Sequence, residues 1–307
     1  MTEPMDVLRD FEVRKTKQQK QAFRDAVTAY AQSLGYTVTV EQGKRGVNNV
    51  VIGDPATAEY LVTAHYDTPA RMILPNLLTP CNLLTYLLYQ ILVVGVLIVA
   101  ALATGWLVSL AGFPEFAFLF GYVVYFGLLI LMMAGPANPH NANDNTSGVV
   151  TALEIARTLP ENHRSKAAFV LFDLEEMGLI GSAAYRKAHK EETDKQIILN
   201  LDCVGDGNNI VLFPTRKLCK DRAKMERLCG IVSRNGKKTI SVCNKGFRTY
   251  PSDQKHFPYG IGIAAFHRKK GVGLYLSRIH TPKDTVLDET NVNTLRAALT
   301  SLISPGI

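Results

Sequence analysis

Two long apolar stretches dominate the middle of this sequence, at residues 83–112 and 116–135. Between residues 72 and 139 there is no Lys or Arg, and Glu115 is the only charged side chain. A membrane-spanning helix needs about 20 consecutive apolar residues, and each stretch supplies them. The GFPE segment between them is typical of a tight turn. The pair therefore predicts a transmembrane helical hairpin, with a buried core hairpin or an oligomer interface as the alternatives.

The flanking parts of the chain indicate which side of a membrane they occupy. A hairpin returns the chain to the side it left, so both flanking parts share one face. The first 20 residues are polar and lack the apolar core of a signal peptide. The five cysteines are odd in number and form no CxxC pair, which favours a reducing compartment. Together with Lys and Arg outnumbering Asp and Glu, 34 to 27, these features predict a cytoplasmic location for the flanking parts.

The net charge of +7 raises the question of an anionic partner. Basic runs such as Arg216-Lys217 are scattered and have no interleaved aromatic residues, so they are interpreted as solvated faces. The expected partner is therefore the lipid bilayer and not nucleic acid.

Outside the hairpin, helical and strand patterns alternate. A helix is expected over residues 6–34, and strands over 36–42, 48–54 and 59–65. After the hairpin come helices at 147–159 and 182–192, strands at 166–176 and 196–205, and a last helix near the C-terminus. Continuously apolar strands between helices predict an α/β fold, with a mixed, mostly parallel central sheet covered by helices on both faces. Residues 1–75 and 137–307 are predicted to form a single domain, interrupted by the hairpin insert at 76–136.

Metal-binding side chains occur at five places where a strand ends or a loop begins. They are His65 with Asp67, Asp144, Glu175 with Glu176, Asp202, and His280. Alone, each has a plain structural interpretation, such as a helix cap or a solvated carboxylate. Together they map to one edge of the sheet, where ligands of such folds bind. Imidazole with carboxylates and no cysteine suits hydrolytic zinc, and two His with three or more acids suggest two ions sharing a bridging carboxylate.

The order of these motifs carries a family resemblance. H-x-D, N-D-N-x-S-G, E-E-x-G-L-x-G-S, N-L-D, S-D and a late His follow one another over residues 36–285, apart from the insert. This order resembles the co-catalytic di-zinc aminopeptidases (metallopeptidase family 28), which include bacterial leucyl aminopeptidases, aminopeptidase Y and glutamate carboxypeptidase II.

The resemblance implies a role for each residue. His65 and Asp202 would hold one zinc, Glu176 and His280 the other, with Asp144 bridging both; other divalent metals would also suit these ligands. Glu175 would be the general base and acid, and Asp67 would orient His65. The family often has His after the S-D pair, where this chain has Gln254. That departure leaves Ser252, Asp253 and His256 as substrate-binding candidates only.

The expected function is a membrane-anchored zinc exopeptidase that removes N-terminal residues from peptides. A single-zinc acyltransferase similar to glutaminyl cyclase is one alternative, and a non-catalytic receptor or scaffold on the same fold is another. The hairpin insert begins shortly after Asp67 and ends shortly before Asp144. The catalytic mouth should then lie near the bilayer, which favours membrane-delivered or amphipathic peptides as substrates.

Overall fold

The computed structural model describes residues 1–74, 76–244 and 246–305. Pro75, the last residue of the first predicted domain segment, lies outside them, as do Gly306 and Ile307. In the described part, ten strands form one sheet in the order β1-β2-β4-β3-β5-β9-β6-β8-β7, with β10 paired to β9. Their bounds are β1 Val38–Gln42, β2 Asn48–Ile52, β3 Tyr60–His65, β4 Ala167–Phe172, β5 Ile197–Leu201, β6 Asn209–Pro214, β7 Ser233–Asn235, β8 Lys238–Val242, β9 Gly260–Lys269 and β10 Gly273–Tyr275.

The centre of the sheet is parallel. β3 pairs in parallel with both β4 and β5, and β5 pairs in parallel with β9. The flanks are mostly antiparallel, as in β1–β2, β2–β4 and β6–β9. The predicted mixed α/β fold is confirmed, with its parallel pairs concentrated at the centre. Because β3 precedes the apolar insert and both its neighbours follow it, the chain on either side of the insert builds one sheet.

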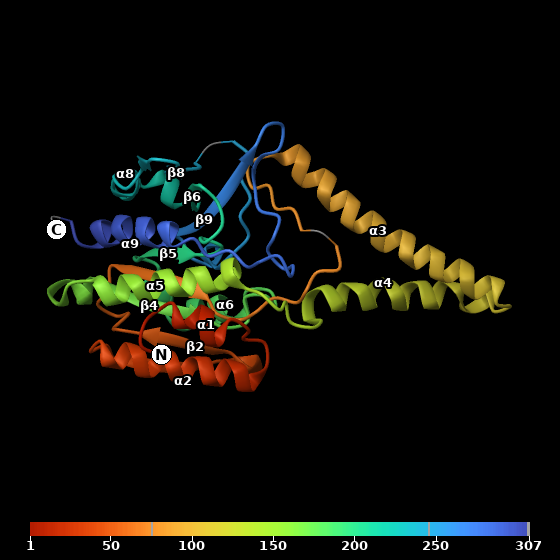
Figure 1. The fold of residues 1–307 in the computed structure, drawn as a ribbon, viewed down its shortest axis with the longest axis horizontal. Coiled ribbons are helices and arrows are strands. Elements are labelled where there is room, and N and C mark those ends of the chain that lie inside the picture. Colours follow the sequence, from red (N-terminus) through yellow and green to blue (C-terminus); the bar gives the residue numbers. More distant parts are fainter. Residues whose placement is uncertain (75, 245, 306–307) are drawn as a thin grey trace.

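Helices cover both faces of this sheet (Figure 1). Tyr60, Val62 and Ala64 of β3 belong to the larger core cluster, which includes side chains from α2 (Lys17–Ser33), α5 (Ser147–Thr158) and α9 (Glu289–Ile303). Leu61, between them, belongs to the cluster on the other face, with Tyr185 of α6 (Ile180–Ala188). A strand that is covered on both faces buries nearly all of its side chains, which explains the long hydrophobic runs in the sequence. Shorter helices lie at Asp6–Phe11 (α1), Lys190–Thr193 (α7) and Arg222–Cys229 (α8).

The single helix expected over residues 6–34 is wrong, because two helices occupy this range. α1 ends at Phe11 and α2 starts at Lys17. Between them, the fully buried Arg14 donates its backbone N–H to the Thr68 hydroxyl at 2.8 Å. Thr16 then caps α2 through a capping box with Gln19. The long-range contact of Arg14 and the local cap at Thr16 thus both accompany the break between the two helices.

The apolar stretches form α3 (Leu83–Leu110) and α4 (Ala117–Ala134), which project from the sheet and its covering helices as an antiparallel pair (Figure 1). Close packing between them depends on small residues, since a Cβ at Gly105 would lie 2.8 Å from the Ala117 carbonyl oxygen. The segments Leu83–Leu110 and Pro114–Ala134 are long and apolar enough to cross a membrane, and only 11% and 6% of an 18-residue apolar stretch in each is buried. With Leu102 68% exposed and Trp106 64% exposed, the alternative of a buried core hairpin is wrong.

The two ends of the hairpin are attached to the sheet domain. Before α3, Leu78 and Leu276 form an antiparallel bridge, and the Pro80 carbonyl accepts the Thr249 N–H at 2.8 Å. Ala70, which precedes the hairpin in sequence, forms a second antiparallel bridge with residue 137, just after α4. These three backbone contacts hold the ends of the hairpin next to the loops that carry the predicted metal ligands.

Candidate metal centre

The predicted metal-binding residues meet at the carboxyl edge of the central strands. His65 ends β3, Asp202 directly follows β5, and the Glu175–Glu176 pair follows β4 by two residues. Asp144 lies in the turn before α5, and His280 lies in the loop before α9. Because β4, β3 and β5 are parallel neighbours, their ends bring these groups together.

Asp144 lies between the two histidines. Its Oδ1 is 3.2 Å from His65 Nε2, and its Oδ2 is 3.0 Å from His280 Nε2. His65 Nε2 is also 3.7 Å from Asp202 Oδ1, and His280 Nε2 is 3.6 Å from Glu176 Oε2. One carboxylate therefore lies between two groups of candidate ligands, each containing one histidine and one further acid.

Asp67 fixes the orientation of the surrounding groups. Its carboxylate accepts the backbone N–H groups of Glu175 at 2.9 Å and Glu176 at 3.2 Å. His65 Nδ1 lies 3.2 Å from the Asp67 carbonyl oxygen and 3.5 Å from Oδ1. With Nδ1 directed at Asp67, Nε2 is the nitrogen that faces Asp144 and Asp202. Although burial raises the pKa of Asp67, hydrogen bonding to His65 and the charge of Lys20 lower it below its ordinary value.

The ligand groups fit metal ions by chemistry and by spacing. Three sets of candidate ligand atoms each lie within 4.8 Å of one another: His65, Asp144 and Asp202; Asp144, Glu176 and His280; and His65, Glu175 and Glu176. Glu176 Oε1 is buried and has no hydrogen-bond partner in the described part of the chain. Such a buried, unpaired carboxylate oxygen is costly unless a cation compensates it. Imidazole and carboxylate donors without thiolates suit zinc.

A cleft of about 370 Å³ opens beside these ligands. Glu175 and Glu176 line it, and in the metal-free protein burial is the main cause that raises the pKa of Glu175 well above its ordinary value. The hairpin contributes Met133 to the same wall. The other lining side chains include Asn76, Leu78, Leu179, Cys203, Tyr250, Pro251, Lys255 and Ile279.

Ser252, Asp253 and His256 are not among the described residues that line this cleft, although their neighbours Pro251 and Lys255 are. Ser252 and Asp253 are fully buried. Ser252 Oγ accepts the Asn200 side-chain amide at 2.9 Å. From this segment it is Tyr250, Pro251 and Lys255 that face the cleft.

Two residues that hold the candidate ligand loops in place, Asp284 and Tyr250, were not predicted from the sequence. Asp284 accepts the backbone N–H groups of Asn143 at 2.9 Å and Asp144 at 3.0 Å, which fixes the bridging loop. Tyr250 donates its hydroxyl to the Asp202 carbonyl at 2.9 Å. Asp284 follows His280 by four residues in the same loop, and this acidic residue next to a metal-ligand candidate is a signal that could have identified it.

Backbone strain also concentrates at this edge. Leu174, Cys203 and His280 have φ angles of 55°, 57° and 59°, a region that non-glycine residues seldom adopt. Each such residue costs of order 1–3 kcal/mol, and such residues tend to cluster at functional sites. All three lie in or beside the ligand loops.

Zinc uptake is expected to release protons at neutral pH. Burial, with nearby carboxylates, raises the pKa of Glu176 to about 8. Burial alone would lower the pKa of His280, but Glu176 and Asp144 raise it to about 9. Below these values both groups hold a proton that metal binding must displace. Calorimetric zinc titrations in buffers of different ionisation enthalpy should therefore show about two fewer protons released at pH 9.5 than at pH 6.5. Equal release at both pH values would contradict this protonation pattern.

Comparison with known proteins gives a consistent family relationship. The sequence profile of peptidase family M28 matches residues 130–303, more than half of the chain. Aminopeptidase YwaD of Bacillus subtilis (strain 168) is 41% identical over 73 residues, which are 23% of this chain and 16% of that protein. The chain thus matches only a small part of this curated relative's length.

Solved structures share the fold at low identity. The glutaminyl cyclase of Porphyromonas gingivalis superposes with a TM-score of 0.61 at 15% identity, covering 97% of this chain and 94% of that one. The LapA aminopeptidase of Legionella pneumophila gives a TM-score of 0.57 at 15% identity, covering 99% of this chain and 68% of that one. The fold is therefore shared by a glutaminyl cyclase and an aminopeptidase. The fold alone does not distinguish the two activities, so the candidate metal ligands have to be considered.

Proposed function

Because this chain belongs to peptidase family M28, we propose that it is a zinc-dependent exopeptidase that removes N-terminal residues from peptides. The position of Asp144 between His65 and His280 is the observation that carries this proposal. A carboxylate with one oxygen toward each of two ligand groups is suited to hold two ions about 3.5–4 Å apart. A single-zinc acyltransferase does not need such a bridge.

The described residues divide into two ligand sets. His65 and Asp202 would hold one zinc, Glu176 and His280 the second, and Asp144 would contact both. When bound, zinc acidifies water and polarises a carbonyl group, which is the chemistry that peptide hydrolysis needs.

Glu175 is the residue proposed to move the proton. It lines the cleft, and its carboxylate lies within 4.8 Å of candidate ligand atoms of His65 and Glu176, one from each set. We assign it the role of taking a proton from the attacking water and delivering it to the leaving amine. The bond from its backbone N–H to Asp67 Oδ1, at 2.9 Å, holds it against the ligand loop.

Digestion of a peptide library tests the reaction. Incubated with the zinc-loaded protein, each peptide should lose one residue at a time from its N-terminus, as read by product masses. Loss of ammonia from peptides that begin with Gln would instead indicate the cyclase activity. Product formation that is equal with the Glu175→Gln variant would show that a contaminant is responsible.

We further propose that the hairpin anchors the enzyme in a membrane, with the catalytic domain on the cytoplasmic side. The length, hydropathy and exposure of α3 and α4 support the anchoring. Met133, in the last turn of α4, lines the metal cleft, so the cleft lies close to the membrane end of the domain. Membrane-delivered or amphipathic peptides are the substrates that such a placement favours.

Shortening the hairpin is expected to release the protein from membranes. A variant in which a Gly-Ser linker of about ten residues replaces residues 84–130 keeps Met133 and both backbone bridges. Such a linker spans about 15–20 Å on average. The full chain should sediment with membranes and the variant should stay in the supernatant, because the exposed apolar surface is gone. A supernatant location of the full chain would refute the anchor.

The same variant tests substrate delivery. Cleavage of a short soluble peptide should be retained, which serves as the control for an intact domain. Cleavage of a lipid-anchored peptide in vesicles should fall by about tenfold, since the local concentration of substrate at the membrane is lost. Equal rates on the anchored peptide would rule out membrane delivery.

A further inference from the structure

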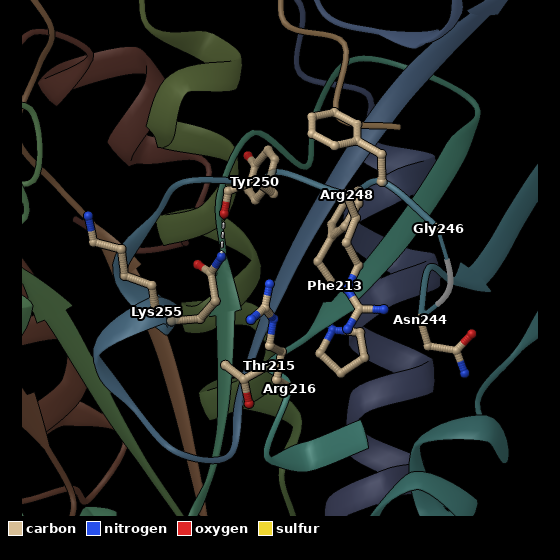
Figure 2. A pocket seen from close by; sticks show the side chains of 11 residues that line it. Phe213, Thr215, Arg216, Asn244, Gly246, Arg248, Tyr250 and Lys255 are labelled. Atoms are coloured by element: carbon tan, nitrogen blue, oxygen red, sulfur yellow. Dashed lines mark hydrogen bonds between the residues drawn. The ribbon is translucent and has the colours of Figure 1, made fainter. Parts of the chain in front are cut away.

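The structure has a second cleft, of about 540 Å³, whose lining residues are drawn in Figure 2. Its walls come from the end of β6 and the turn after it, from the segment after β8, and from the turn at Asp253–His256. Its volume is in the range typical of small-ligand sites, about 300–1,000 Å³. Tyr250 and Lys255 line this cleft and the metal cleft as well, so the two spaces are adjacent.

The charges of the two clefts are opposite. Arg216, Arg248 and Lys255 line the second cleft, and its described lining contains no Asp or Glu. Within the described residues, no carboxylate forms an ion pair with any of these three cations. Four acids, by contrast, line the metal cleft: Asp144, Glu175, Glu176 and Asp202. We refer to the second space, lined by Arg216, Arg248 and Lys255, as the cationic cleft.

The walls of the cationic cleft are held in place by contacts to the fold. Gln254 donates its side-chain amide to the Tyr250 carbonyl at 2.7 Å, as drawn in Figure 2, and accepts the Asn200 amide at 3.1 Å. Arg248 is half-buried, and its Nη2 donates to Cys219 Sγ at 3.4 Å. Arg248, fixed by this contact, should lose little freedom when an anion binds.

We propose that the cationic cleft is a specificity site that binds an acidic side chain of the peptide substrate, Asp or Glu, while the scissile bond lies at the metal centre. The inference rests on the proposed peptidase function and names its substrate class. An arginine fork matches a carboxylate geometrically. An extended peptide advances about 3.3–3.6 Å per residue, and the two clefts share a wall. The acidic residue is therefore expected within the first four positions of the substrate.

Lipid headgroups are the competing anions, because the wall of the cationic cleft touches the base of the hairpin. Thr249 bonds to Pro80, and the Phe247 ring centroid lies 6.0 Å from that of Tyr86 in α3. The walls shared with the metal cleft, through Tyr250 and Lys255, favour a substrate group over a lipid.

A peptide scan with the zinc-loaded full chain in detergent micelles tests the proposal. Glu is moved through positions one to four of an otherwise neutral peptide, and each peptide is paired with one that has Gln at the same place. At one position Glu should raise kcat/KM by about tenfold over Gln, the effect of one well-placed charge pair. The preference should shrink as salt rises from 0.05 to about 0.5 M, because ions screen exposed charges.

The Arg216→Gln/Arg248→Gln double variant assigns the preference to the cleft. It should abolish the preference for Glu while cleavage of the Gln peptide stays within about twofold of the original. Arg222→Gln, at an exposed arginine of α8 that does not line the cleft, is the matched control and should keep the preference.

Three results would overturn the inference and leave the peptidase function standing. The first is cleavage without any preference for Glu. The second is a preference for Glu that survives in the double variant. The third is a double variant that selects peptides as the original protein does but binds vesicles of anionic lipid more weakly. Failure to cleave any peptide would instead refute the proposed peptidase function.

Discussion

Replacing Glu175 by Gln is expected to lower kcat by about 10²–10⁴-fold, which is the usual contribution of a positioned general base. The amide keeps the shape of the carboxyl group but cannot take a proton from water. Folding should be almost unaffected, because the amide has nearly the same size as the carboxyl group, and burial, which raises the pKa of Glu175 well above its ordinary value, disfavours a charge at this place. The measurement is kcat on the best peptide of the library, with zinc content determined on the same samples.

Two matched variants separate the role of Glu175 from a general effect of removing acids. Glu176→Gln removes a proposed ligand, so it should lower zinc content as well as activity. Glu191→Gln changes an exposed residue of α7 and should alter neither. A Glu175→Gln protein that has lost its zinc would show that Glu175 is a ligand and not the base.

The sequence was informative about the site because chain topology places strand ends together. His65, Asp202 and the Glu175–Glu176 pair each follow an apolar run, and parallel strands bring such ends to one edge. That prediction did not depend on the order of the strands in the sheet. Asp144 and His280 precede helices instead. They were predicted as metal-binding side chains at loop starts, and the family resemblance implied their separate roles.

Features that depend on long-range contacts could not be predicted. The break between α1 and α2 arises because Arg14 is buried against Thr68, 54 residues away in sequence. The capping box of Thr16 and Gln19 is the local signal for the start of α2, and the helical periodicity of the run concealed it. Similarly, Arg216 was interpreted as part of a solvated face. It is indeed exposed, but the fold brings it to the same cleft as Arg248 and Lys255.

Replacing Asp144 by Asn is expected to remove at least one of two zinc ions and to lower kcat/KM by more than about a thousandfold. Asn keeps one oxygen, so it cannot face both ligand groups as a carboxylate does at 3.2 and 3.0 Å from the two histidines. Without the bridge, Glu175, Glu176 and Asp202 also lose compensating positive charge. The measurement is zinc per chain by elemental analysis after dialysis against metal-free buffer, with two expected in the original protein and one or none in the variant.

The control for this substitution is Asp206→Asn. Asp206 is equally buried, but its carboxylate contacts His267 at 2.8 Å and Arg278 at 3.4 Å instead of the proposed ligands. That variant should keep two zinc ions even where its melting temperature falls. One zinc in the original protein, unchanged by Asp144→Asn, would refute the bridging role and favour the single-zinc acyltransferase. Two zinc ions retained by the Asp144→Asn variant would show that each ligand group binds its ion independently, because the second histidine–acid set would then suffice on its own.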